Sequence, residues 1–258
     1  MSDTDFSKRK FFMHPAHVAV GVSTNAATLG DATTVGTTPD LKRETAALSV
    51  CMLSGSAADK SNKSLEGFAG FLRKNYAVQC AGSWNERVSA VATLDDLEWC
   101  DCLLLFAQRM DLDRDQLQRL RRYVARGGAV VALRSAGRAV QQWPDLDRKI
   151  LGTAHRGQCN NRSTEVNPAD AAVEHDVLKD VAPFVSRCRL CKQGELSADA
   201  EVLLTGTSYG RVEPVAWARE HKGGRIFYTS LGHPDDFFHP SFLQLLVNAI
   251  SWTTRQPL

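Results

Sequence analysis

The sequence has no surplus of charge of either sign. Its 258 residues include 31 lysines and arginines and 29 aspartates and glutamates, which leaves a formal net charge of +2. Proteins that attract nucleic acid or acidic membranes electrostatically carry a clear excess of positive charge. Because the charges nearly balance, the chain as a whole shows no electrostatic preference for nucleic acid, and we expect no nucleic-acid partner.

A paired set of cysteines is also missing. The chain has seven cysteines, an odd number at scattered spacings. A small domain stapled by disulfides would show an even number in a regular framework. We therefore expect a fold whose thiols mostly stay reduced. A chain of this length can bury a full core without such staples.

The sequence shows no convincing membrane span. Residues 11–30 contain no Asp, Glu, Lys or Arg, but they include His14, His17, Thr24 and Asn25. A bilayer core of about 20 residues tolerates little polarity of this kind. We expect no transmembrane helix.

The first 46 residues differ in composition from the rest. Residues 16–39 consist mostly of Ala, Gly, Ser and Thr, which pack poorly. Residues 7–12 resemble the start of a twin-arginine export signal, although the twin arginine itself is missing. We expect residues 1–46 to be a leader, disordered or a decayed export signal, and residues 47–258 to form one domain. The protein would lie in the cytoplasm, or in the periplasm if the leader still works.

From residue 48 onward, apolar runs alternate with amphipathic helical patterns. Continuous apolar strands are typical of a parallel sheet that helices cover on both faces. Ser64 is the predicted N-cap of the first helix, and Asp113 with Gln116 forms a predicted capping box for the second. The pattern predicts an α/β fold with a mainly parallel sheet. The expected strands are 48–53, 77–81, 100–107 and 129–133.

The chain changes character after residue 150. Residues 153–172 are polar and irregular, and four shorter strand-like runs follow. Apolar side chains then recur at helical spacing over residues 242–250, which predicts a closing helix. The strand-like runs are 187–190, 202–205, 214–218 and 225–230.

Polar side chains follow several of the predicted strands. In an open parallel sheet, ligands bind beyond the carboxyl ends of the strands. One such end is usually an ordinary turn, but four together favour a shared pocket. The polar residues at these ends are Ser54, Ser56, Gln108, Arg109, Arg134, Ser135 and His233.

The strand 129–133 runs into a tight turn at Arg134 and Ser135. A strand-to-helix elbow of this kind presents the nucleophile in many hydrolases. Arg134 cannot lose its proton at working pH, so it is neither a base nor a nucleophile. It suits the binding of a carboxylate, a phosphate or sugar hydroxyls. We expect Ser135 to bind substrate rather than to act in a serine triad.

Two interpretations fit the segment Gly232-His233-Pro234-Asp235-Asp236. In the first, Asp235 orients His233 as a general acid/base. In the second, Asp235 or Asp236 caps the final helix, and His233 is a structural hydrogen-bonding residue. The sequence leaves both open.

The residues that could hold a metal are few and dispersed. Metal binding needs several His, Cys, Asp or Glu side chains in one place. His155, Cys159 and His233 are candidates, with His239 as a weaker fourth, so a divalent metal has weak support and no ligand is assigned. Cys188-Arg-Leu-Cys191 is a single C-x-x-C whose thiols would point to opposite faces of a strand. We expect these two thiols to be structural.

Several segments taken together resemble the trehalose-utilisation (ThuA-like) family. The resemblance covers about residues 48–254. Its most specific part is the run Gly224-Arg-Ile-Phe-Tyr-Thr-Ser-Leu-Gly-His-Pro-Asp235. The other segments are Glu213–Glu220, Leu246–Trp252, Cys51–Ser56, Cys100–Phe106 and Gly127–Leu133.

The resemblance implies the class I glutamine amidotransferase-like superfamily and its flavodoxin-like three-layer α/β/α fold. True amidotransferases have a Cys at the elbow and a His-Pro-Glu late in the chain. Here Arg134 stands at the elbow, and His233-Pro234-Asp235 is similar to the second motif. The chain therefore lacks the thiol nucleophile for glutamine hydrolysis, and glutaminase activity is not expected.

The resemblance also implies a role in carbohydrate metabolism, on trehalose or a keto-disaccharide. Relatives carry a histidine-rich segment after Leu151-Gly152, where this chain keeps only His155, followed by Arg156. We expect both residues to bind substrate. The loss of the other histidines weakens the case for a metal and for catalysis.

Two functions therefore remain in view. In the first, the protein is a carbohydrate enzyme in which His233 is the acid/base, Asp235 orients it, and Gln108, Arg109 and Arg134 bind the substrate. The alternative is a non-catalytic small-molecule or sugar-binding module on an inherited fold. Both take a small-molecule ligand, and self-association into a homo-oligomer stays open.

Overall fold

The computed structural model describes residues 48–83 and 94–258. The predicted leader, residues 1–46, lies outside the described residues, so that expectation stays a prediction.

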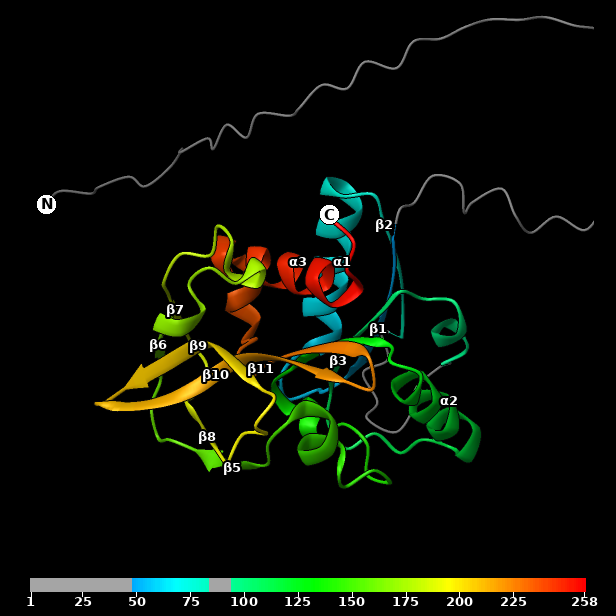
Figure 1. Ribbon diagram of the computed structural model, residues 1–258, viewed down its shortest axis with the longest axis horizontal. Helices are drawn as coiled ribbons and strands as arrows, with labels where there is room; N and C mark the ends of the chain where they lie inside the picture. Colours follow the sequence, from blue (N-terminus) through cyan, green and yellow to red (C-terminus); the bar gives the residue numbers. More distant parts are fainter. Residues whose placement is uncertain (1–47, 84–93) are drawn as a thin grey trace, which may run out of the picture. The chain divides into compact units, whose positions relative to one another are not determined.

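A nine-stranded sheet runs through the described domain (Figure 1). The strand order is β2-β1-β3-β4-β11-β10-β9-β6-β7, and a separate two-stranded ribbon pairs β5 with β8. The strands are β1 (Leu48–Gly55), β2 (Val78–Ser83), β3 (Cys102–Ala107), β4 (Ala129–Leu133), β5 (His155–Gln158), β6 (Thr164–Pro168), β7 (Phe184–Ser186), β8 (Cys191–Gln193), β9 (Glu201–Ser208), β10 (Arg211–His221) and β11 (Gly224–Thr229).

The sheet has a parallel half and an antiparallel half. Strands β2, β1, β3, β4 and β11 pair in parallel, which confirms the α/β fold that the apolar runs predict and the flavodoxin-like architecture that the resemblance implies. Strands β11, β10, β9, β6 and β7 pair antiparallel. Two tight turns, Tyr209-Gly210 and Lys222-Gly223, join β9, β10 and β11, and both residues of each turn have positive φ. Such turns match the twist of the strands they connect.

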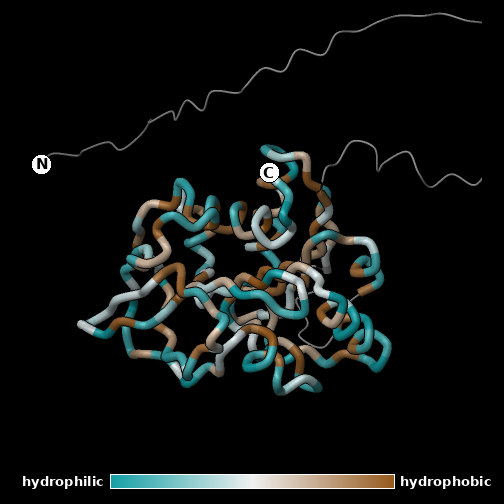
Figure 2. The backbone as a smooth tube through the Cα atoms, in the orientation of Figure 1, coloured by the Kyte–Doolittle hydropathy of each residue, from teal (hydrophilic) through white to brown (hydrophobic). Residues whose placement is uncertain are grey.

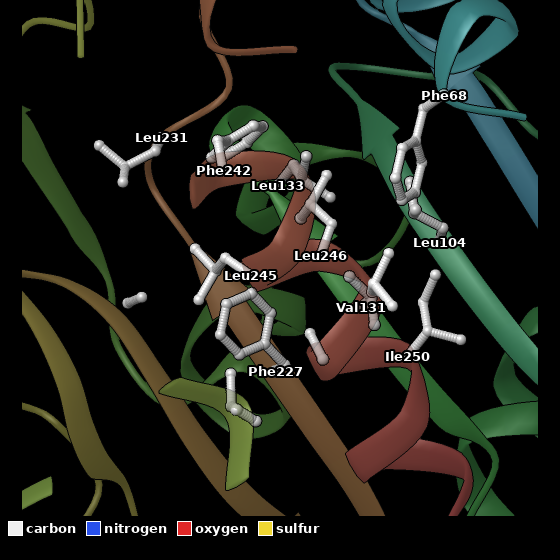
Figure 3. Close-up of a cluster of buried hydrophobic side chains, with 14 of the residues drawn as sticks. Phe68, Leu104, Val131, Leu133, Phe227, Leu231, Phe242, Leu245, Leu246 and Ile250 are labelled. Atoms are coloured by element: carbon white, nitrogen blue, oxygen red, sulfur yellow. The ribbon is translucent and has the colours of Figure 1, made fainter. Parts of the chain in front are cut away.

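Helices cover both faces of the sheet (Figure 1). The helices are α1 (Ser61–Asn75), α2 (Arg114–Ala125) and α3 (Pro240–Thr254). Helices α1 and α3 pack on one face and α2 on the other, which gives two buried apolar clusters. In the first cluster, Val131 and Phe227 of the sheet lie against Leu246 and Ile250 of α3 (Figure 3). The short 3₁₀ or π turns are η1 (Asp95–Glu98), η2 (Arg134–Arg138), η3 (Leu146–Leu151), η4 (Asp170–Ala172), η5 (Asp176–Leu178) and η6 (Pro234–Phe238).

Helix α2 begins as the capping box predicts. The Asp113 carboxylate accepts a hydrogen bond from the Gln116 backbone N–H at 2.8 Å, and the Gln116 side chain accepts from the Asp113 N–H at 3.2 Å. The predicted N-cap of α1 is wrong. That helix begins at Ser61, after Lys60, which has a left-handed backbone conformation.

Residues 187–190 do not form the predicted strand. They connect β7 to β8. Their side chains alternate between exposed and buried, as in a half-buried strand, but no described strand pairs with them. The polar segment 153–172 contains β5 and β6, which the sequence pattern did not indicate.

Hydropathy along the backbone follows burial (Figure 2). Hydrophilic residues make up much of α2, which buries only Leu120, Tyr123 and Val124. Within residues 48–83 and 94–258, no helix combines the length and the apolar character that crossing a bilayer requires.

Two glycines let the β10–β11 turn approach the end of α2. Gly127 follows α2 with a φ of 82°, and Gly224 opens β11. A Cβ at Gly224 would lie 2.4 Å from the carbonyl oxygen of Gly127. Because the contact is with backbone, no side chain can rotate away to relieve it. Residue 224 therefore requires glycine.

We expect Gly224→Ala to lower the free energy of unfolding by about 1–3 kcal/mol, as overpacking does at a rigid site. The control is Gly70→Ala in α1, where an added Cβ meets nothing within 4 Å. Alanine there should raise the free energy of unfolding by about 0.5–1 kcal/mol, because glycine is a poor helix former. Urea denaturation measures both changes. A Gly224→Ala protein as stable as the parent would contradict the close approach.

Candidate functional site

A cavity of about 400 Å³ opens at the carboxyl ends of β4 and β11. The turn η2 forms one wall, and the β5–β8 ribbon faces it across the cavity. Four predicted substrate-binding residues line it together, namely Gln108, Arg134, Ser135 and His155. The structure therefore places these side chains around one space, as expected for residues at the same sheet edge.

The other predicted site residues lie outside the lining of this cavity. Ser54 is buried with its hydroxyl 2.8 Å from that of Ser61. Arg109 is exposed, and its backbone N–H donates to the Arg138 carbonyl. Arg156 points away from the neighbouring His155 on the β5 strand and lies over Gly194. The remaining three are Ser56, His233 and Asp235.

Arg134 occupies the elbow in a left-handed conformation, with a φ of 49°. A non-glycine residue in this region costs about 1 kcal/mol, so the surroundings must hold it there. The Tyr228 hydroxyl donates to the Arg134 carbonyl at 2.6 Å. Gly232, at a φ of 118°, leaves room for the aliphatic part of the Arg134 side chain.

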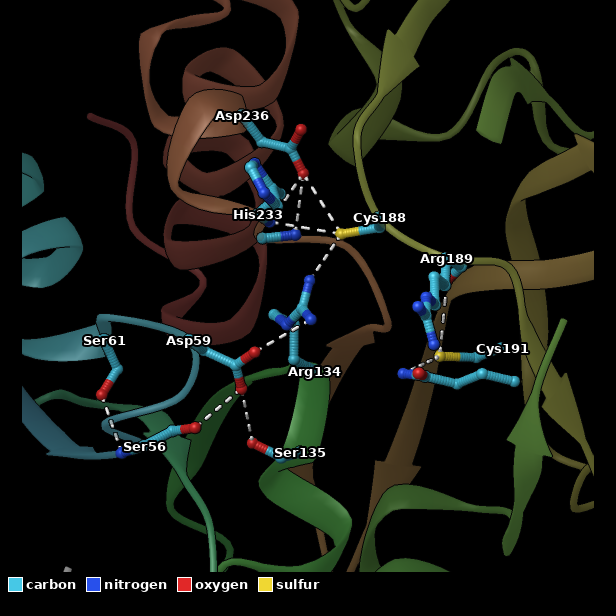
Figure 4. Close-up of polar contacts among 12 residues, drawn as sticks. Ser56, Asp59, Ser61, Arg134, Ser135, Cys188, Arg189, Cys191, His233 and Asp236 are labelled. Atoms are coloured by element: carbon cyan, nitrogen blue, oxygen red, sulfur yellow. Dashed lines mark hydrogen bonds and ion pairs between the residues drawn. The ribbon is translucent and has the colours of Figure 1, made fainter. Parts of the chain in front are cut away.

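The Arg134 guanidinium lies between an acid and a thiol (Figure 4). One nitrogen is 2.9 Å from the Asp59 carboxylate, and another donates to the Cys188 sulfur at 2.7 Å. Burial acts to lower the pKa of Arg134, but the Asp59 carboxylate opposes it, and the pKa is raised overall, so the charge stays. Asp59 also accepts from the hydroxyls of Ser56 at 2.7 Å and Ser135 at 3.3 Å.

Cys188 connects this pair to a second buried acid. Its sulfur lies 3.5 Å from the Asp236 carboxylate and accepts from the His233 backbone N–H at 3.2 Å (Figure 4). The same Asp236 oxygen accepts from the backbone N–H groups of Gly232 and His233 and from the Ser186 hydroxyl. Asp236 is only 3% exposed. It therefore fixes the turn after β11 from within the core.

His233 makes its side-chain contacts at the start of η6. Its Nδ1 accepts from the Asp235 backbone N–H at 3.2 Å. The Asp235 carboxylate is 3.8 Å from that nitrogen and 3.2 Å from Arg187. The geometry is that of a cap on η6 made by His233 and Asp236, whereas the final helix α3, which the second interpretation had Asp235 or Asp236 cap, is capped by His239. A catalytic role for His233 and Asp235 stays a prediction.

The β5–β8 ribbon presents paired polar side chains to the cavity. His155 lies opposite Gln193, and Gln158 opposite Cys191. All four line the cavity. Burial, and then the positive charge of Arg138, lowers the pKa of His155, while Asp147 partly opposes them. His155 is therefore a neutral hydrogen-bonding group at pH 7.

Two aromatic rings complete the lining. Trp217 of β10 and Tyr228 of β11 are in contact, with ring centroids 4.4 Å apart. The Trp217 indole N–H donates to the Leu151 carbonyl at 2.6 Å. Trp217 is fully buried and Tyr228 is 5% exposed, so the two rings form the packed floor beneath the cavity and present little surface to a ligand.

Within residues 48–83 and 94–258, the cysteines and histidines do not assemble into a metal centre. All seven cysteines are free thiols. Among the described residues, no three His, Cys, Asp or Glu side chains gather as metal ligands would. The Nδ1 of His239, one of the candidates, instead accepts from the Ser241 N–H and caps α3. This donor set does not fit a bound metal.

Sequence reasoning missed several residues of the site. Asp59 comes after a turn signal, and nothing in the sequence joins it to the elbow. The sequence predicts Cys188 only as a structural thiol and Asp236 only as a helix cap. Arg138 follows Arg134 by one turn of η2, and a helical wheel would have found it. Gln193 carries no signal of its own.

The sequence matches the family model described as trehalose utilisation (ThuA) over residues 49–253. No curated protein sequence matches the chain. The solved structure of a ThuA-like protein from Parabacteroides merdae is 17% identical, with a TM-score of 0.59, and the match covers 80% of this chain and 90% of that one. A ThuA-like protein from Bacteroides uniformis is 16% identical, with a TM-score of 0.61, over 84% and 95%.

A β-galactosidase from Bacillus circulans sp. alkalophilus also has a similar fold, with a TM-score of 0.55 and 14% identity. The match covers 81% of this chain but 31% of the enzyme, so it concerns only part of that chain. At these identities, all three structures show a shared fold.

Replacing Asp236 with alanine should lower the free energy of unfolding by about 3 kcal/mol or more. The change leaves two backbone N–H groups and the Ser186 hydroxyl buried without an acceptor, at about 1–3 kcal/mol each. The exposed neighbour supplies the control, since Asp235→Ala should change stability by about 0.5 kcal/mol or less. If urea denaturation gave equal losses of unfolding free energy for the two variants, the structural role assigned to Asp236 alone would be contradicted.

The Cys188 thiol should resist alkylation by iodoacetamide at pH 8 in the native protein. Burial raises the pKa of Cys188 to about 12. The reactive thiolate is then about one part in ten thousand, and the sulfur is also enclosed. Peptide mapping by mass spectrometry should show Cys159, which is half-buried, labelled first. Rapid labelling of Cys188 in the native protein would show that its contacts with Arg134 and Asp236 open readily.

Proposed function

The chain belongs to the trehalose-utilisation (ThuA) family, and from this premise we propose that it binds a carbohydrate in the cavity beside the Arg134 elbow. The family supports a role in carbohydrate metabolism. The observation that carries the proposal is the composition of the cavity, which several uncharged hydrogen-bonding side chains line together.

A sugar presents hydroxyls around its rim and C–H groups on its faces. Here Gln108, Gln158 and His155 line the cavity with hydrogen-bonding groups that suit the hydroxyls. The volume of about 400 Å³ falls within the usual range of small-molecule sites, about 300–1,000 Å³. Trehalose and keto-disaccharides are the members of this class that the family name favours.

The geometry favours binding without glutamine chemistry. The elbow residue is a guanidinium, which cannot act as a nucleophile. Cys188 lies beside it, but burial keeps that thiol protonated at neutral pH. A class I amidotransferase reaction therefore has no nucleophile at this elbow.

A non-catalytic module is the second candidate function. The observation in its favour is that His233 and Asp235 use their described contacts in the η6 cap and in the Arg187 ion pair. In the enzyme alternative, His233 would act through Nε2, because Nδ1 accepts the Asp235 N–H. Product formation that His233→Ala abolishes, with binding retained, would identify the enzyme.

A panel of mono- and disaccharides and their 3-keto forms should include ligands that stabilise the protein against heat. Binding at 100 times Kd adds about 2.7 kcal/mol to the free energy of unfolding. For a domain of this size, that raises Tm by about 5–11 °C.

Two variants locate the binding. Gln108→Ala should weaken the stabilisation, since this side chain lines the cavity, whereas Arg122→Ala on the exposed surface of α2 should leave it unchanged. If no sugar shifts Tm, or if both variants respond alike, the carbohydrate site is not where we propose it.

A further inference from the structure

The hydrogen-bond donors around the cavity differ in whether they already have partners. The hydroxyl of Ser135 donates to Asp59, and that of Thr153 donates to the Glu195 carbonyl. Ser230 bonds the Val215 carbonyl. The Arg134 charge is matched by Asp59 at 2.9 Å. These groups have little left to offer an anionic ligand.

Arg138 is different. It lies on η2, one turn beyond the elbow, and lines the cavity. Among residues 48–83 and 94–258, its guanidinium has no hydrogen-bond or ion-pair partner. It lines the cavity together with His155 and Cys191 of the ribbon, and its positive charge adds to burial in lowering the pKa of His155.

Gln193 supplies the second unused donor. It lines the cavity from β8, directly opposite His155 across the ribbon. Its side-chain Nε2 is the one buried nitrogen or oxygen of a side chain that lacks a partner in the described part of the protein. A buried donor without an acceptor costs about 1–3 kcal/mol. A ligand acceptor would remove this cost.

The acidic group of the cavity limits where an anion can lie. Asp147 lines the same space, and one of its oxygens accepts from the Arg148 backbone N–H. Its other oxygen can accept from a sugar hydroxyl but would repel a ligand anion. A ligand with hydroxyls at one end and an anionic group at the other would suit both Asp147 and Arg138.

We infer that the ligand is a sugar acid, an aldonate or uronate, whose carboxylate lies between Arg138 and Gln193 beside His155. The inference rests on the proposed carbohydrate function and narrows its ligand class. The Arg138 guanidinium has no ion-pair partner among the described residues, and a planar guanidinium with an amide matches a planar carboxylate. A phosphate, with a charge of about −1.5 to −2, would leave part of its charge unpaired.

Titration calorimetry with the full chain tests this, using glucose, glucuronate, gluconate, glucose 6-phosphate and the non-sugar carboxylate malonate. We expect the sugar acids to bind about tenfold or more tightly than glucose. Arg138→Gln should remove that preference while changing glucose affinity less than about twofold. Asp147→Asn should tighten the sugar acids, because it removes a repelling charge.

Arg122→Gln, an exposed arginine on α2, is the matched control and should retain the preference. Unchanged Tm values confirm that the variants are folded. Sugar acids that bind no better than glucose, or that keep their advantage in Arg138→Gln, would overturn the inference and leave the carbohydrate site intact. Tighter binding of glucose 6-phosphate would also overturn the carboxylate assignment.

Different results would reject the carbohydrate-binding proposal itself. If malonate binds as tightly as the sugar acids, and if glucose does not bind at all, the cavity is a carboxylate site without sugar recognition. If no compound on the panel binds, both the carbohydrate function and the sugar acid are rejected.

Discussion

A buried positive charge at the end of β4 must be balanced where water has little access, and the site is arranged around that requirement. Asp59 lies on the loop after β1, Cys188 on the link between β7 and β8, and Asp236 in η6. Removing one partner of such a buried pair would leave an uncompensated charge, at a cost of several kcal/mol. Segments distant in sequence are thereby held in one arrangement around Arg134.

Arg134 at the elbow has a strained, left-handed backbone, but its side chain is a guanidinium where hydrolases have a nucleophile. In hydrolases of related architecture, this geometry lifts a nucleophile toward a substrate. Here the left-handed residue extends a guanidinium sideways into a polar network. The open space lies beside the network, between η2 and the β5–β8 ribbon. The network therefore forms part of the cavity wall, through Asp59, Arg134 and Ser135.

Strands β1, β3 and β4 of the parallel half could be predicted from sequence because they are mostly apolar runs buried on both faces. β6 could not, because only Thr164 and Val166 are buried and the intervening residues are polar. Residues 187–190 show the reverse case, in which a strand was predicted and none forms. Their side chains alternate between exposed and buried because every second one packs against the core, yet no described strand pairs with them. Arg134 was found because a local turn marks it. Asp59 and Cys188 were not assigned to it because no local pattern records contacts between distant segments.

The two halves of the sheet differ in the length of chain between neighbouring strands. β9, β10 and β11 follow one another through two-residue turns, whereas β4 ends at Leu133 and its partner β11 begins at Gly224. Short loops close at lower entropic cost, so the three-stranded meander can form by itself. During synthesis, β1, β3 and β4 leave the ribosome before the strand that completes their side of the sheet exists. These three apolar strands must stay shielded from aggregation until β11, residues 224–229 of 258, emerges.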